Sequence, residues 1–550
     1  MPPAFHPQQD SSPERVSAPH LPQNSPGRNI ALSTPVGPGS SHHVVTSSFQ
    51  SHQAKCVADP DQPFEKPKRP PFHRQEAALV SVTALHLCFL PWALGAMPVW
   101  SQLMSLALAI AGFVLAAWPH AVRENSNHEP RTRYWPAVRL LRSPVFWAGL
   151  VFLGYITIQG LNPAWRFQSN EDTWWLEPLD QVAWLPSSVD APFERSNAWR
   201  MLTVFGSLLL LVCSVWIGFT RRKSYHALLT LLAINAGLLA LFGLAQRLSG
   251  TQLIFWRYVS SNSKFVASFI YPNHAGPYFY LLTAVAVGLA WWHAQRTRQQ
   301  LETHGKAAAF VFIATCCSLL VIFSYSRMAV ILLLVLILST GVHLVIRLLQ
   351  RTGPTRYRPE SLPLALILMA VACVGLVTLQ TDRIRERFSD LIANPAAAIL
   401  DRTLPRQAAT DMFRDHWMYG WGAGCFRYGF PKYTKTYPEI HYFPHGPRRY
   451  WEHAHNDLLE FPVELGIVGM LPLAGVLGFA VWQFYRQRFW RNVLSLSLVL
   501  GCALIILHAW VDFVFQNPAI LLTWSVLLAG ALRWIELDQP SGRKVTPHTA

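Results

Sequence analysis

The fold is decided by two long apolar blocks with one short polar turn between them, which read AAAFVFIATCCSLLVIFSYSRMAVILLLVLILSTGVHLVIR (Ala307–Arg347). Each block approaches the ~20 apolar residues that a helix needs to cross the hydrocarbon core of a bilayer. In that core every backbone N–H and C=O group needs a partner within the protein, and only helices and closed barrels provide one. The stretch therefore predicts two membrane-spanning helices, 307–324 and 327–347, joined by a tight hairpin.

The same composition continues along the chain. Of its 550 residues, 51% are hydrophobic and only 14% are charged, with 22 Trp and 31 Phe, which is far from the average of soluble proteins. The ~20-residue criterion predicts about twelve spans in all. The remaining ones are 77–95, 97–118, 144–161, 200–219, 225–247, 270–295, 361–380, 457–484, 491–512 and 517–536. The sequence thus predicts an all-α, polytopic membrane protein.

The basic residues lie mainly in short connections between the apolar blocks, so the formal net charge of +16 is a topology signal. No nucleic-acid partner is expected. If the N-terminal tail is cytoplasmic, the basic connections all fall on the inner side, as the positive-inside rule requires: 123–142, 221–223, 296–306, 347–358 and 486–491. The acidic loop 162–199 and the long loop 381–456 then face the outside.

The predicted organisation follows from these spans and from a Pro-, Ser-, His- and Gln-rich start that cannot offset the entropy of ordering. Its parts are a disordered cytoplasmic tail (1–75), N-terminal transmembrane helices with an outer loop (76–199), a transmembrane core (200–380), a large periplasmic loop (381–456), C-terminal transmembrane helices (457–536) and a second cytoplasmic tail (537–550). Most cysteines lie inside apolar blocks, so no disulfide framework is expected.

Several polar residues that are unusual near a membrane fall on the outer side in this topology. They are Asn273, His274, Arg327, Arg402, Arg406, His455, Glu464, His508, Asp512 and Gln516. Charged groups at membrane depth are costly and usually functional. Their convergence on one leaflet predicts a polar cavity that is open to the outside.

The stretch HAHNDLLEFPVELGIVG (His453–Gly469) brings two imidazoles to the boundary between the long loop and an apolar block. Imidazole titrates near neutral pH, which suits proton transfer. His455 and Asn456, followed by Glu464 and Gly466, resemble the signature of the O-antigen ligase and polymerase superfamily of bacterial inner-membrane proteins.

Four further segments, in the same order, are similar to those of this superfamily. They are SFIYPNHAG (Ser268–Gly276), the hairpin Tyr325-Ser326-Arg327, the arginine segment that begins at Asp401-Arg402 and ends in GWGAGCF (Gly420–Phe426), and HAWVDFVFQNPA (His508–Ala519). Trp417 stands where relatives often have Pro, and Arg406 stands where they often have Trp. Either Arg402 or Arg406 is therefore the functional arginine, and the motif spacing favours Arg402.

The resemblance implies a glycosyltransferase of lipopolysaccharide or exopolysaccharide assembly in the bacterial inner membrane. Its donor would be a polyprenyl-pyrophosphate-linked glycan that it binds on the periplasmic face of the membrane. Membrane lipids are further expected partners. Its acceptor would be a saccharide, lipid A-core or a protein, since polymerases, ligases and protein-glycosylating relatives share the motifs. No metal or other cofactor is expected.

The family position makes His455 the general base that takes the proton of the acceptor hydroxyl. Arg327 and Arg402, with Arg406 third, are expected to bind the pyrophosphate, because guanidinium offers a charged bidentate fork. The supporting residues are His453, Asn456, Glu464, Asn273, His274 and Asp512. Glu464 follows His455 by about two and a half helical turns, so we expect it to pack the helix or line the cavity and not to orient His455.

Two other classes of protein stay open at this point. A transporter would also have many spans and polar groups near the midplane, but here the polar residues cluster at the outer rim. A metal-dependent membrane hydrolase could use His453 and His455 as ligands, although no H-E-x-x-H motif or Cys/His cluster accompanies them. The transferase is the favoured hypothesis.

Overall fold

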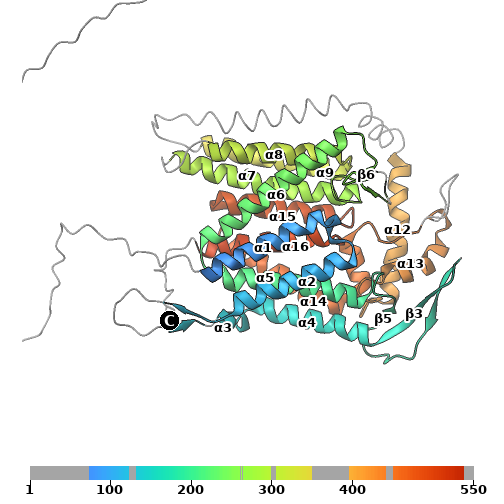
Figure 1. Ribbon diagram of the computed structural model, residues 1–550. Coiled ribbons are helices and arrows are strands. Elements are labelled where there is room, and N and C mark those ends of the chain that lie inside the picture. Colours follow the sequence, from blue (N-terminus) through green and yellow to red (C-terminus); the bar gives the residue numbers. More distant parts are fainter. Residues whose placement is uncertain are drawn as a thin grey trace, which may run out of the picture. The chain divides into compact units, whose positions relative to one another are not determined.

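The structure is a computed structural model that describes residues 74–122, 132–134, 136–171, 173–260, 262, 264–298, 305–349, 395–440 and 450–537 (Figure 1). These residues belong to one unit, Arg69–Ala550. Outside the described residues lie the predicted tails, except for their innermost residues, and the whole predicted span 361–380. Part of the predicted loop 381–456 also lies outside them.

Helices form the body of the described chain. Eleven of them correspond to the predicted spans other than 361–380: α1 (Arg74–Trp92), α2 (Val99–Ala117), α4 (Pro144–Leu161), α5 (Ala198–Gly218), α6 (Arg222–Leu248), α7 (Pro272–Arg298), α8 (Gly305–Phe323), α9 (Arg327–Leu349), α14 (Asp457–Arg486), α15 (Val493–Ala509) and α16 (Pro518–Glu536). Within the described residues, 8 helices are long and apolar enough to cross a membrane. The all-α, polytopic class predicted from composition is therefore confirmed.

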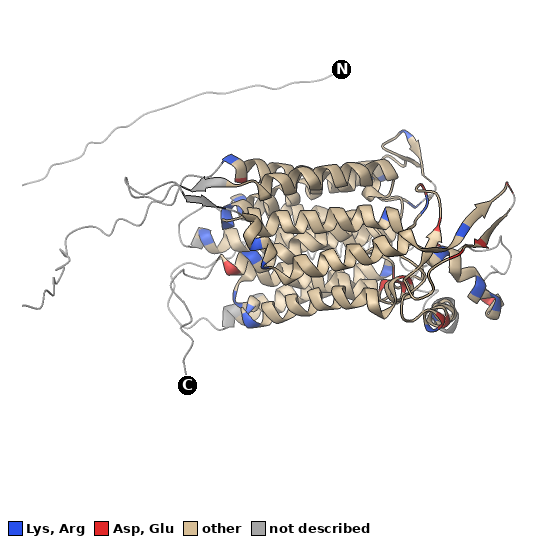
Figure 2. Cartoon of the chain, turned by 90° about the horizontal axis from the view of Figure 1, so that it is seen from below, with Lys and Arg blue, Asp and Glu red and all other residues tan. Residues whose placement is uncertain are grey.

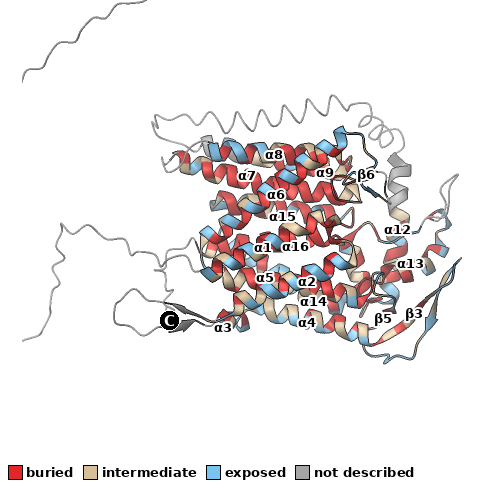
Figure 3. Cartoon of the chain, in the orientation of Figure 1, coloured by how far each residue is buried: buried red, intermediate tan, exposed pale blue. Residues whose placement is uncertain are grey.

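The helices differ sharply in how much protein surrounds them. In α7, 94% of the most apolar window is buried, and Tyr278, Phe279 and Tyr280 are fully inside. In α4 and α14 the corresponding fractions are only 17% and 22%, and apolar side chains such as Leu471 stay exposed. A helix that is apolar all round is stable where other helices surround it. Figure 3 shows α7 in the buried layer and α4 at the edge of the bundle.

Because the helices alternate in direction, connections that are distant in sequence meet at one end of the bundle. There, Ser268 Oγ donates to Pro91 O at 2.6 Å and Arg247 donates to the Tyr325 hydroxyl at 2.9 Å. We call this the site end. At the opposite end, which contains the connections 219–221 and 487–492, Lys and Arg residues gather (left in Figure 2).

The site end also holds small sheets, which the sequence analysis did not predict. In the connection 162–197, β3 (Pro163–Ser169) pairs antiparallel with β4 (Trp174–Pro178) and parallel with β5 (Ser188–Asp190). One face of this sheet packs through Phe167 and Val189 on Cys425 and Tyr428. β6 (Leu253–Ile254) and β7 (Tyr258–Val259) form a second small sheet there, whereas β1 (His120–Val122) and β2 (Thr132–Tyr134) pair at the opposite end of the bundle (Figure 1).

The described part of the long loop is mostly helical. It contains α12 (Pro395–Asp415), α13 (Phe426–Tyr433), η2 (Thr434–Thr436) and η3 (Pro438–Ile440). Ala408, Met412, Phe430 and Val463 form a separate apolar cluster that joins α12 and α13 to the start of α14. The loop is thereby packed on the helix that follows the His-x-His motif. The remaining short helices are η1 (Leu94–Ala96), α3 (Pro136–Leu141) and η4 (Phe489–Arg491).

Candidate functional site

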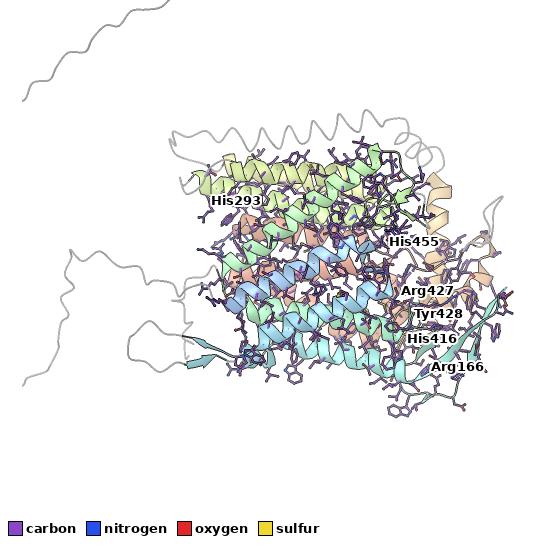
Figure 4. The ribbon with its side chains drawn as sticks, in the orientation of Figure 1. Arg166, His293, His416, Arg427, Tyr428 and His455 are labelled. Atoms are coloured by element: carbon purple, nitrogen blue, oxygen red, sulfur yellow. The ribbon has the colours of Figure 1, made fainter. Side chains whose placement is uncertain are left out.

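A cavity of about 140 Å³ opens among three segments at the site end. It is lined by Tyr271, Asn273, Pro405, Arg406, Trp451, Ala454 and His455. We call it the His455 cavity. Figure 4 places His455, Arg427 and Tyr428 at this end of the helices and His293 at the opposite end. Three of the predicted site residues line this cavity: Asn273, Arg406 and His455.

His455 lies in the turn before α14 and is held by a carboxylate. Its Nδ1 is 3.3 Å from Oδ1 of Asp512, and the other carboxylate oxygen accepts a 2.6 Å hydrogen bond from the Asn273 side-chain amide. The His455 side chain is 33% exposed and that of Asp512 is 5% exposed. His455, the candidate base, is therefore accessible from the cavity, whereas Asp512 is buried.

The electrostatics of this pair define which imidazole nitrogen can take a proton. Burial raises the pKa of Asp512, but the hydrogen bond and charge of His455 and the charge of His508 outweigh it, and the pKa falls below its usual value. An ionised Asp512 can only accept a hydrogen bond, so Nδ1 of His455 carries the proton. Nε2 is then the nitrogen that can act as a base.

The backbone at His455 has φ 52°, in the left-handed region that costs a non-glycine residue roughly 1–2 kcal/mol. Such conformations persist where the surroundings over-determine them, and they cluster at active sites. Here Asp457 N donates to Asp512 O at 3.3 Å and Phe515 N donates to the Asp457 carboxylate at 2.7 Å. Both bonds join the start of α14 to the connection 510–517.

His453 has a separate carboxylate partner that the sequence analysis missed. Its Nδ1 is 2.7 Å from Oε1 of Glu460, a residue with 0% exposure whose other oxygen accepts the backbone N–H of Ala454 at 2.6 Å. Burial, reinforced by the charge of Arg427, lowers the pKa of His453 to about 3. His453 is thus a neutral, enclosed imidazole. In the sequence, Glu460 looks like an ordinary acidic residue in the first turn of a helix, where it interacts favourably with the helix dipole. The contact with His453 could therefore not be predicted.

The other supporting residues hold the walls of the site. His274 is buried, and its Nε2 lies 3.1 Å from Phe513 O. Asn456 is the N-cap residue of α14 but makes no side-chain cap hydrogen bond. Its buried Oδ1 has no hydrogen-bond partner in the described part of the chain.

The glycine segment fits into a break in α14 at Gly466 (φ 63°, ψ −179°). Trp421 N donates to Val463 O and Ile467 N donates to Trp417 O, at 2.9 and 2.8 Å. A Cβ on Gly420 would lie 2.3 Å from Glu464 O, and one on Gly466 would lie 2.3 Å from Met418 O. Only glycine fits both positions. We call residues 417–426 together with 463–468 the glycine clasp.

Glu464 belongs to the glycine clasp and not to the His455 cavity. Its carboxylate is buried and accepts the backbone N–H groups of Gly424 and Phe426 at 2.9 and 3.0 Å. α4, which matches no family segment, completes the clasp: Ala423 N donates to the Gln159 side chain at 3.0 Å and the Tyr155 hydroxyl bonds to Leu465 O at 2.6 Å. An N-terminal span thus supports the family core.

Of the three predicted arginines, two belong to α12 and one begins α9. Arg406, on α12, lines the His455 cavity and donates to Trp510 O at 2.9 Å. The side chain of Arg402 lies outside the described residues, although its backbone is one helical turn earlier on α12. Arg327 begins α9, is half-buried, does not line this cavity, and makes no hydrogen bond or ion pair with the described residues.

A fourth arginine, Arg427 on α13, was not predicted. Its side chain is 17% exposed and lies 3.4 Å from the Glu452 carboxylate. It is close enough to His453 to help lower the pKa of that imidazole. The motifs did not indicate Arg427, because it follows the GWGAGCF segment and carries no spacing signal of its own. Its position adds positive charge near His453.

A family model matches part of the chain. Residues 309–474 match the family model described as O-antigen ligase, a range that contains Arg327, Arg406, His455 and the glycine clasp. No curated protein matches the chain. Asn273 and Asp512, which hold His455, lie outside the matched range on either side. The match supports the O-antigen ligase and polymerase superfamily, and the apolar helices agree with a multi-pass membrane protein.

Proposed function

We propose that the protein is a glycosyltransferase that moves a saccharide from a polyprenyl-pyrophosphate carrier to an acceptor hydroxyl on the periplasmic face of a bacterial inner membrane. The reaction would serve lipopolysaccharide or exopolysaccharide assembly. The observation that carries the proposal is the His455 cavity, where an imidazole oriented by Asp512 lines the same space as the guanidinium of Arg406. A base and a fixed cation are what this transfer needs.

In the proposed step, Nε2 of His455 removes the proton of the acceptor hydroxyl as the oxygen attacks the anomeric carbon. The bond from that carbon to the pyrophosphate oxygen breaks, and its electron pair leaves with the pyrophosphate. Asp512 is a positioning residue: it fixes the tautomer of His455 and stabilises the imidazolium that forms. The Asn273 amide holds Asp512 in place.

We assign the leaving-group contact first to Arg406, in place of Arg402, because Arg406 lines the cavity. Arg402, which the motif spacing favours, stays the second candidate for this contact. Arg327, without a partner among the described residues, is assigned to the donor at a greater distance from His455.

The same chemistry accommodates each acceptor class. A saccharide, lipid A-core or a protein side chain each offers a hydroxyl that must lose its proton during attack, so one general base serves them all. His453 is neutral and enclosed by Glu460, which favours a role in supporting the turn that carries His455.

Substitution of Arg406 tests this assignment. We expect Arg406→Ala to weaken donor binding and to slow turnover together, because the guanidinium contacts both the bound pyrophosphate and the charge that grows as it departs. Arg406→Lys should restore only part of both, since it lacks the bidentate fork. Donor binding and single-turnover transfer are measured separately with a purified lipid-linked donor.

Arg414→Ala is the matched control, because Arg414 is on the same helix, has a side chain that is 73% exposed, and does not line the cavity. The control should behave as the wild type. If Arg406→Ala binds and transfers the donor as Arg414→Ala does, the leaving-group assignment fails. If the wild type transfers no saccharide from any lipid-linked donor, the function itself is wrong.

A further inference from the structure

A second cavity lies at the end of α14 that is opposite to His455. Its volume is about 380 Å³, and it is lined by Tyr485, Arg486, Arg488, Trp490 and Arg491. We call it the arginine cavity. Because α14 has 30 residues between its two ends, the two cavities are separated by on the order of 40 Å. The arginine cavity is therefore not part of the site described above.

The lining of the arginine cavity is cationic and aromatic, with no acidic residue. Arg486 lies over the Trp482 ring at 5.0 Å, and neither it nor Arg488 pairs with a carboxylate of the described chain. The Tyr485 and Trp490 rings are 6.0 Å apart. Guanidinium groups recognise phosphate oxygens through paired hydrogen bonds, and Tyr and Trp prefer the level of lipid headgroups.

Backbone geometry provides a second, independent observation. Arg488 has φ 52° and ψ 55°, directly after Gln487, the C-cap residue of α14. Helices commonly end on a left-handed residue at this position, and glycine is preferred there because it has no Cβ. The backbone of Arg488 is therefore strained, and a glycine at this position would relieve that strain. A strained backbone at a non-glycine residue points to a role for its side chain.

The position of the cavity identifies the source of the phosphate. Along the last turns of α14, Val481, Trp482 and Tyr485 are 60%, 51% and 73% exposed, so an apolar strip leads up to the arginines. A free phosphate ion would not use this strip, whereas a phospholipid would lay its acyl chains along it. We propose that the arginine cavity binds the headgroup phosphate of an anionic phospholipid in the leaflet at that end.

Lipid binding to the intact purified protein tests the proposal. Native mass spectrometry measures the affinities for phosphatidylglycerol and phosphatidylcholine, with inorganic phosphate as a competitor. We expect preferential binding of phosphatidylglycerol. The triple variant Arg486→Gln, Arg488→Gln, Arg491→Gln should weaken that binding by roughly 100-fold, because each basic side chain near a lipid surface contributes about the same increment.

The matched control removes three basic residues from other segments at the same end of the bundle: Arg221→Gln, Lys223→Gln and Arg296→Gln. It should keep the lipid preference. Equal loss in the control would show that overall charge, and not this cavity, attracts the lipid. Displacement of the lipid by millimolar phosphate would show a free-phosphate site. Either result overturns the proposal.

A single substitution keeps the test decisive if the triple variant folds poorly. Arg488→Gly should raise the melting temperature of the lipid-free protein, because glycine relieves the left-handed backbone. The same variant should bind phosphatidylglycerol about five-fold more weakly, the increment of one basic side chain. A variant that is more stable and binds the lipid unchanged would contradict the proposal.

Discussion

The His455 cavity and the glycine clasp both involve the first part of α14 or the turn before it, but they are built in different ways. In the cavity, side chains make the contacts: Asp512 orients His455, and Arg406 lines the space beside it. In the clasp, backbone groups make most of them, and the Glu464 carboxylate serves only to accept two backbone N–H groups. Motif residues therefore divide into those that perform chemistry and those that hold the backbone that positions it.

The first prediction concerns the His455 cavity, where we expect a loss of rate without a loss of stability. His455→Ala should slow single-turnover transfer by a factor of roughly 10² to 10⁴, the usual contribution of a general base. Donor affinity and melting temperature should stay close to those of the wild type, because a neutral imidazole offers the pyrophosphate little and is 33% exposed. His343→Ala, which removes a half-buried imidazole near the opposite end of the bundle, is the control and should leave the rate unchanged.

The second prediction addresses the clasp. Gly466→Ala places a Cβ 2.3 Å from Met418 O on a backbone that only glycine adopts, so it should destabilise the protein by on the order of 3 kcal/mol. The melting temperature reports this loss. Gly475→Ala, with nothing within 4 Å of the added Cβ, is the matched control and should be as stable as the wild type or slightly more so. Equal melting temperatures for the two variants would contradict the account of the clasp.

The third prediction uses the buried imidazole. The pKa of His453 is about 3 in the folded chain, against a usual value of 6.5. Below 6.5 the unfolded chain binds a proton that the folded chain does not, so the free energy of unfolding should fall as the pH drops from about 6.5 to about 3. Above that window both states are neutral and the effect is absent. In His453→Gln the melting temperature should fall less over this range, and an unchanged pH dependence would show that His453 is not enclosed.

The smallest expected effect concerns metals. Transfer should survive chelation, because arginines and not a cation neutralise the pyrophosphate in the proposed step. Within the described residues, no group of three or more His, Cys, Asp or Glu could hold a metal ion. Rates with and without EDTA provide the measurement. Loss of activity that a divalent ion restores would favour a metallohydrolase with His453 and His455 among its ligands.

The fold was predictable to the extent that a single physical rule determines it. Blocks of ~20 apolar residues predict spanning helices. Eleven described helices correspond to these blocks, and 8 helices of the described chain are long and apolar enough to cross a membrane. Alternation of the helices then predicts that Asn273, Arg406, His455 and Asp512 meet at one end. The strands at 163–190 were not predicted, because they are short, contain Pro, and become stable only by packing on Cys425 and Tyr428.

The roles of the individual site residues were harder to predict from the sequence than the fold was. Asp512 holds His455 across 57 residues of sequence, and no spacing rule connects them. The face argument for Glu464 assumed a regular helix from the motif onward, whereas His455 precedes α14 and the helix breaks at Gly466. Motif spacing favoured Arg402, whose side chain lies outside the described residues, and Arg406 lines the cavity. Spacing along the chain does not reveal which side chains line a cavity.

The central claim is that His455 and Asp512 act as one unit, and a double-mutant cycle on the transfer rate tests it most directly. Single-turnover rates are compared for the wild type, His455→Ala, Asp512→Asn and the double variant, with donor binding and melting temperature as controls. Since Asp512 acts through His455, the double variant should be no slower than His455→Ala alone. If the two losses multiply, or if His455→Ala transfers at the wild-type rate, the proposed mechanism is contradicted.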